Sequence, residues 1–262
     1  MKNLPATIDE HRDYLYEAVR LKLFFLHKFL EENPAEEFSF ALRNRVDIFR
    51  KTSLNPEGLN PAGDYFETPG YLEFEEILFT LYKFYQHDRE EFERIGFNFV
   101  RPYIDARVER DFYDRSALAG VCCGFLRVMR PTVPEKPGVS VFHMVNTRKP
   151  DSFLDDPEFM KESLLALCDL AESYGAVEVG TNSWLNQVPA WLHYFPDSFL
   201  ANREAANTDV RWHYGFWGQF INARGCFNKK AGDFLRKNGK FPCYPSYAHC
   251  PVSDLREHLK HL

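Results

Sequence analysis

The sequence predicts an α/β or α+β fold, with a helical N-terminal half packed on a mixed sheet formed by the second half. Helical periodicity dominates the chain up to residue 110. Beyond it, a short apolar run at 139–145 is followed by an amphipathic helix and a second apolar run at 176–180. Two buried strands joined by a helix run parallel with a right-handed crossover, so this order predicts a strand–helix–strand unit.

Four helices are expected in the N-terminal half, over residues 7–32, 39–51, 70–86 and 89–110. Thr7 and Glu10 form a capping-box pattern at the start of the first. That helix ends at Asn33, because a proline follows and disfavours helical backbone in the residue before it. Residues 53–69 are predicted to be a loop, which is either a plain surface connection or a lid over a site.

The second half is less regular. Residues 117–129 are small and apolar, and periodicity does not decide between helix and strand there. We expect residues 1–262 to form a single domain. If the chain has an internal division, it is expected at residues 131–138, a connector that contains three prolines. A helix is expected between Pro157 at its first position and Gly175 after its last turn, with Asp156 as its N-cap. After it we expect a helical stretch at 191–199, a strand at 210–216 and a turn at 222–225. Two closing helices are expected at 228–239 and 253–261, the second with Ser253 as its N-cap.

Composition excludes several classes of protein. With 262 residues, 45% hydrophobic and 27% charged, the chain is expected to be globular. A formal net charge of −6 with scattered Lys and Arg speaks against nucleic-acid binding. The densest apolar stretch, residues 21–30, is too short and too charged to span a membrane, and the N-terminus lacks the apolar run of a signal peptide. We therefore expect a cytoplasmic protein with reduced cysteines.

Polar side chains follow both predicted parallel strands. Because ligands bind beyond the carboxyl ends of such strands, these residues are the first candidate site. Arg148 and Lys149 suit a phosphate or carboxylate, unless Arg148 is paired with a nearby aspartate. The candidates for small-molecule binding are Asn146, Arg148, Lys149, Asn182, Ser183, Trp184 and Asn186, with His143 as a general base.

A second candidate cluster lies in the aromatic run at 211–219. His213 is a natural general acid or base, and Trp217 and Gln219 are candidate ligand contacts. The alternative is that these residues are structural. Aromatics make up 16% of the chain, which fits either a phenylalanine-rich core or an aromatic-lined pocket.

Residues 138–195 resemble the core of the GNAT-type N-acetyltransferases. The matching residues are the stretch 171–180 followed by Asn186, Ala190 and Tyr194. The resemblance implies acetyl-CoA or another acyl-CoA as cofactor, with Asn186 positioning it and Tyr194 acting as general acid. The glycine-rich pyrophosphate loop of that family is absent between residues 146 and 158, and Phe195-Pro196 replaces its final Gly-Phe.

Three functions remain open on the sequence alone. The first is a small-molecule enzyme, most concretely an acyltransferase that uses a CoA thioester and has His143 or His213 as its base. The second is a metal-dependent enzyme with His143, His193 and His213 as ligands. The third is a non-catalytic interaction protein whose partner surface is the 53–69 loop together with exposed aromatics.

Overall fold

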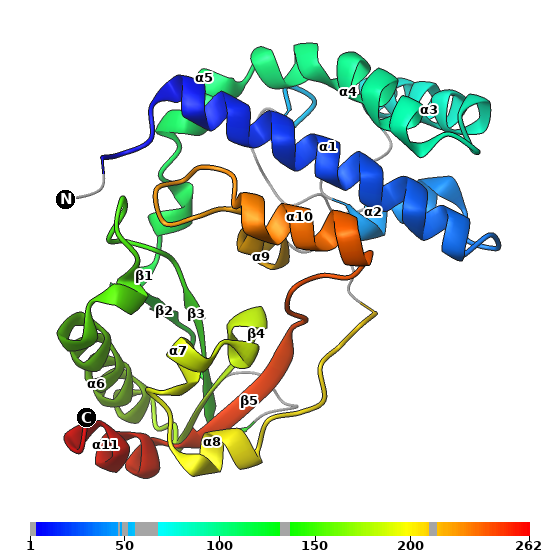
Figure 1. Cartoon of the computed structure of the whole chain (residues 1–262). Helices are drawn as coiled ribbons and strands as arrows, with labels where there is room; N and C mark the ends of the chain where they lie inside the picture. The colour runs from blue at the N-terminus through cyan, green and yellow to red at the C-terminus, as the bar shows by residue number, and fades with distance from the viewer. Residues whose placement is uncertain (1–3, 47, 49–51, 56–67, 132–136, 210–213) are drawn as a thin grey trace. The chain divides into compact units, whose positions relative to one another are not determined.

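The structure is a computed structural model that describes the chain except residues 1–3, 47, 49–51, 56–67, 132–136 and 210–213. The chain folds into two compact units (Figure 1). The α/β unit comprises Met1–Pro5, Arg115–Asp209 and Cys243–Leu262, and the helical unit comprises Ala6–Asp114 and Val210–Pro242. The chain crosses between them after residues 5, 114, 209 and 242, not at the predicted connector 131–138.

The helical unit is built around a long first helix, which packs against α2, α4, α5 and α10. Its elements are α1 (Ile8–Glu32), α2 (Phe38–Arg45), α3 (Pro69–Phe84), α4 (Arg89–Asp105), α5 (Val108–Tyr113), α9 (Tyr214–Trp217), a 3-10 turn at Gly218–Phe220 and α10 (Lys229–Asn238). The capping box of α1 is confirmed, since Thr7 and Glu10 exchange both hydrogen bonds. The helix predicted over 89–110 is interrupted after Asp105 and continues as α5.

Two predictions in this unit need comment. The strand predicted at 210–216 is wrong for its described part, because residues 214–217 form the helix α9. The physical reason is an aromatic cluster in which Trp217 and Phe220 both lie against Phe241, at 5.2 and 5.8 Å between ring centroids, which suits helical spacing. The predicted loop 53–69 lies outside the described residues over most of its length, and so does His213.

Buried His27 makes the stability of the helical unit sensitive to pH. It is 1% exposed, its Nε2 donates to the carbonyl of Tyr85 at 3.1 Å, and burial lowers the pKa of its imidazole. As the pH falls through about 6.5, the unfolded chain takes up a proton that the folded chain refuses, so the folded state loses stability. His27→Gln keeps a donor for Tyr85 and removes the titration.

We therefore expect the free energy of unfolding, measured by urea denaturation, to fall more between pH 7.5 and pH 5.5 in the natural chain than in His27→Gln. An equal fall in both proteins would show that His27 is not the group responsible.

The α/β unit contains a five-stranded sheet in the order β1-β2-β3-β4-β5. The strands are β1 (Val121–Cys123), β2 (Leu126–Val128), β3 (Val139–Met144), β4 (Glu178–Ser183) and β5 (Ser246–Pro251). The central pair β3–β4 is parallel and every other neighbouring pair is antiparallel. The α/β fold class with a mixed sheet in the second half is thus confirmed, and the 117–129 segment proves to be a short hairpin.

Helices cover one face of this sheet (Figure 1). They are α6 (Pro157–Ser173), α7 (Pro189–Leu192), α8 (Asp197–Ala201) and α11 (Val252–Lys260); single 3-10 turns occupy Ser116–Leu118, Phe153–Asp155 and Trp184–Gln187. The predicted caps of α6 are present: Asp156 accepts the amide of Phe159, and Gly175 has φ +76°. Ser253 does not cap α11, which begins after Pro251.

The core of the α/β unit lies between the sheet and these helices. Phe142, Val179 and Cys250 enter it from the sheet, and Leu164 and Trp191 enter it from the helices. No helix among the described residues is both long enough and apolar enough to cross a membrane.

Candidate functional site

The two parallel strands separate at their carboxyl ends. The β3–β4 ladder pairs Val139 with Glu178, Ser140 with Val179 and Val141 with Gly180, and ends there. Both strands continue for three residues, β3 beside β2 and β4 beside β5. The last three residues of β3 and of β4 are therefore not paired with each other. This end of the sheet is where ligand sites form in α/β folds.

Side chains at this end divide between the two faces of the sheet, because successive strand residues point to opposite sides. Phe142 and Thr181 are buried on the face that the helices cover, whereas His143 and Asn182 are exposed on the other. We call this other face of β3–β5 the outer face. Its members, by alternation and register, are Val139, Val141, His143, Glu178, Gly180, Asn182, Tyr247, His249 and Pro251.

A histidine–carboxylate pair lies on the outer face. Nδ1 of His249 lies 3.1 Å from Oε2 of Glu178, and both side chains are 30% exposed. His249 is directly opposite Gly180 in the β4–β5 ladder. The contact is an ion-pair distance without hydrogen-bond geometry, because Nδ1 of His249 has no hydrogen-bond partner among the described residues. A carboxylate beside an imidazole stabilises the imidazolium that forms when the ring accepts a proton, which suits a general base.

Tyr247 completes this group. Its ring stacks on His249 at 5.6 Å between centroids. The position of its hydroxyl depends on Gly180, because a Cβ there would lie 2.6 Å from that oxygen. Burial raises the pKa of Tyr247 to about 12, and the Glu178 and Glu204 carboxylates add to the effect. The phenol therefore stays protonated at neutral pH, and its oxygen is buried.

The charge of this part of the outer face is negative. Neither β4 nor β5 contains a lysine or arginine, and Glu178 and Glu204 both act on Tyr247. Such a surface favours a cationic or neutral ligand over an anion.

The polar residues predicted to follow the first parallel strand, Asn146, Arg148 and Lys149, lie in the loop after β3. Nδ2 of Asn146 donates to the carbonyl of Asp151, and Oδ1 of Asn146 accepts the amide of Arg148. The Arg148 guanidinium lies 2.5 Å from Asp156 and 4.9 Å above the ring of Phe159. Arg148 is thus paired with an aspartate, which was the alternative to phosphate binding. Lys149 is exposed at the same loop.

The second predicted segment faces inward after Asn182. Ser183 accepts the amide of Leu185 with its hydroxyl, and Trp184 packs against the core. Asn186 is fully buried; its Nδ2 donates to the carbonyls of Thr181 (3.0 Å) and Ser246 (2.7 Å), and its Oδ1 accepts the indole N–H of Trp191 (3.1 Å). The Nδ2 and Oδ1 atoms of Asn186 both hydrogen-bond to groups within the protein, so Asn186 links β4, β5 and α7.

Tyr194 and His143 are not brought together. Tyr194 is 6% exposed and belongs to the core on the helix-covered face, whereas His143 lies on the outer face. Burial raises the pKa of Tyr194, and the Asp156 carboxylate adds to the shift. The two residues expected to act as acid and base of one reaction therefore lie on opposite sides of the sheet.

The remaining candidates lie in other parts of the molecule. Trp217 is buried in the helical unit, and Nε2 of Gln219 donates to the carbonyl of Phe216. His193 follows α7, and its carbonyl faces Nε2 of His258 at 3.0 Å. Within the part of the chain that the structure describes, no three His, Cys, Asp or Glu side chains are placed to hold a metal ion.

Sequence reasoning missed Glu178, Tyr247 and His249. Their proximity depends on the β4–β5 register, which joins segments about seventy residues apart. In the sequence, His249 stands out only as a neighbour of Cys250. Comparison with protein-family models, with curated proteins and with solved structures finds no match for this chain.

Proposed function

We propose that the α/β unit is an enzyme that performs acid–base chemistry on a small molecule at the outer face, with His249 as the general base. The Glu178–His249 pair beside Tyr247 is the observation that supports this proposal most strongly. It lies on the face that also presents His143 and Asn182, but towards the amino-terminal end of the parallel pair, because Glu178 is the first residue of β4 and is paired with Val139 at the start of β3. The acidic surroundings favour a substrate that bears an amine.

Each residue has a distinct part in this chemistry. Glu178 lies 3.1 Å from Nδ1 of His249, and in this proposal the neutral ring carries its proton on Nδ1, so that the lone pair of Nε2 accepts a proton from the substrate. The carboxylate then stabilises the imidazolium that forms. Tyr247 remains protonated and stacks on His249, which fixes the plane of the imidazole, and the imidazolium returns its proton to the leaving group. Asn182, exposed opposite Tyr247, offers hydrogen bonds that orient the substrate.

Acyl transfer from a thioester to an amine is the more specific candidate, and the separation of β3 and β4 favours it. The backbone groups on the facing edges of the last three residues of each strand can pair with an extended chain that bears amides, as an added strand would. The pantetheine arm of an acyl donor is such a chain. His249 would deprotonate the amine that attacks the thioester carbonyl.

The nucleotide half of CoA does not fit the same arrangement. At the start of α6, the Asp156 carboxylate already accepts the amide of Phe159 and is paired with Arg148. A pyrophosphate would meet this carboxylate, and no glycine between residues 145 and 156 allows close approach of backbone amides. We therefore assign no residue to the nucleotide.

The test is a turnover screen of the full chain against amines, with S-acetyl-pantetheine and acetyl-CoA as donors and thiol release as the signal. In parallel, depletion of a mixed metabolite pool is followed by mass spectrometry. We expect at least one compound of the pool to be consumed, and both thioesters to react at similar rates because only their shared arm is bound. If metabolites are consumed but no thiol is released, acyl transfer is excluded and the acid–base proposal stands. If no compound is consumed, the acid–base proposal itself is contradicted.

A further inference from the structure

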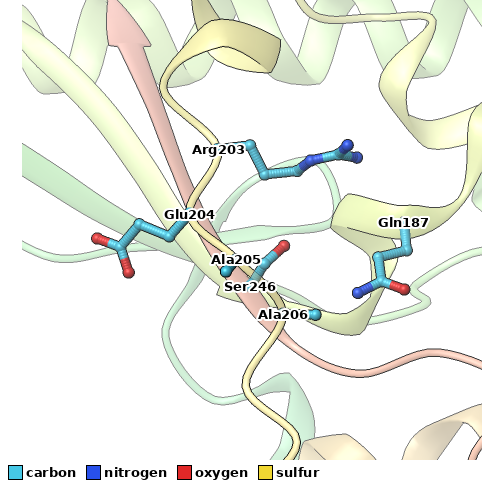
Figure 2. Close-up of a pocket in the computed structure, with 6 residues that line it drawn as sticks. All are labelled: Gln187, Arg203, Glu204, Ala205, Ala206 and Ser246. Carbon is cyan, nitrogen blue, oxygen red and sulfur yellow. The ribbon is translucent and has the colours of Figure 1, made fainter.

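A hollow with a volume of about 500 Å³ lies at the other side of β5, beyond the carboxyl end of β4. Figure 2 shows the residues that line it: Gln187, Arg203, Glu204, Ala205, Ala206 and Ser246. The volume is within the range of small-molecule sites, about 300–1,000 Å³. The lining residues are not the ones that the proposed reaction uses, although the carboxylate of Glu204 also acts on Tyr247.

The wall of the hollow is a segment that runs beside β5. The amide of Glu204 donates to the carbonyl of Tyr247 at 2.9 Å, and the amide of Asn207 donates to that of Pro245 at 2.8 Å. On the opposite side, Nε2 of Gln187 donates to the carbonyl of Tyr244 at 2.8 Å. Backbone and side-chain bonds therefore fix both walls, and the hollow is part of the folded sheet edge.

Arg203 is held in place but has no ionic partner. Its Nη1 donates to the carbonyl of Asn186 at 2.8 Å. No carboxylate of the described residues is paired with it, which leaves Nε and Nη2 available. Figure 2 shows the carboxylate of Glu204 directed to the side opposite Arg203 and Gln187. On the side of Arg203 and Gln187, the charge of the lining residues is therefore that of one guanidinium.

Ser246 supplies a second donor. The residue is 3% exposed, and its hydroxyl has no hydrogen-bond partner among the described residues. Figure 2 shows this hydroxyl directed to the side on which Arg203 and Gln187 lie. A buried hydroxyl without a partner costs free energy, so a ligand oxygen that accepts its proton would be stabilised there. The guanidinium and the hydroxyl converge on the same kind of ligand group, an oxyanion.

We infer that this hollow binds a small organic carboxylate. A carboxylate accepts two parallel hydrogen bonds from a guanidinium, which no neutral group matches. The methyl groups of Ala205 and Ala206 provide apolar contact for the carbon skeleton, which inorganic phosphate lacks.

The test uses the full chain and arginine Nε–Hε NMR signals, with benzoate, benzamide and inorganic phosphate as probes. The Arg203 signal is assigned by its absence in Arg203→Lys. We expect the Arg203 signal to shift saturably with benzoate, with a Kd on the order of 1 mM. Benzamide or phosphate at the same concentration should shift it much less. The internal control is Arg256 of the same unit, which is paired with Asp169 and Glu172 at 2.7 Å and should not respond.

Two variants complete the experiment. Arg203→Gln should abolish the thermal stabilisation that benzoate gives the natural chain. Ser246→Ala, which keeps the Arg203 anchor, should weaken benzoate binding by about threefold to tenfold, the usual worth of one hydrogen bond. The inference is overturned if benzoate causes no saturable shift, if benzamide shifts the Arg203 signal equally, or if Arg256 responds to the same extent.

Discussion

His249→Gln is expected to lower kcat/KM for any substrate of the outer face by about 10²–10⁴, the usual contribution of a general base. Glutamine has a similar length and can still hydrogen-bond to Glu178, but it cannot accept a proton. The side chain is 30% exposed, so the fold should survive the exchange. Initial rates on the substrate found by the screen, together with circular dichroism, measure both effects.

The matched control is His258→Gln. His258 belongs to the same unit, and its Nε2 faces the carbonyl of His193 at 3.0 Å, away from the outer face. We expect its turnover to equal that of the natural chain. The kcat/KM of Glu178→Gln should lie between those of His249→Gln and His258→Gln, because the base remains but loses the neighbouring carboxylate. Equal rates in His249→Gln and His258→Gln would remove His249 from the mechanism.

Trp191→Ala is expected to lower the free energy of unfolding by about 4 kcal/mol, which is the typical cost of removing a buried aromatic ring. Trp191 is fully buried and lies 4.8 Å from Phe195 and 6.2 Å from Phe125, measured between ring centroids. Its indole N–H also donates to Oδ1 of Asn186, whose amide links β4 to β5. The exchange therefore removes core volume and a buried hydrogen bond together.

Trp191→Phe separates these two contributions. It keeps most of the ring volume and loses the hydrogen bond, so a smaller loss of about 1–3 kcal/mol is expected. Urea denaturation of the three proteins gives the comparison. A loss below about 1 kcal/mol in Trp191→Ala would show that Trp191 is not central to the core of the α/β unit.

The parts of the fold that sequence reasoning recovers are those with local signals. The Thr7 capping box, and the Asp156 and Gly175 ends of α6, each specify a helix end within a few residues. β5 was missed because its large residues, Tyr247 and His249, are polar and point outward, whereas small residues face the core. Its strand character comes from pairing with β4, which a local pattern does not contain.

The candidate site could be predicted only in part from the sequence, for a similar reason. The rule for the ends of parallel strands indicated His143 and Asn182 as candidates at one end of the sheet, and alternation places both on the outer face. The same alternation turns Ser183 inward, and Asn186 beyond it is buried. The Glu178–His249 pair needs the register of two strands distant in sequence, so residue types alone do not reveal it.

The most direct test of the proposed base is the protonation pattern of the His249 ring, observed by ¹⁵N NMR of histidine-labelled protein at pH 8 and assigned with His249→Gln. The proximity of Nδ1 to Glu178 predicts that, in the neutral form of the ring, the proton lies on Nδ1 and Nε2 is bare, and it predicts that Glu178→Gln shifts the proton towards Nε2. A ring protonated on Nε2 in the natural chain, or a pattern unchanged by Glu178→Gln, would contradict the account.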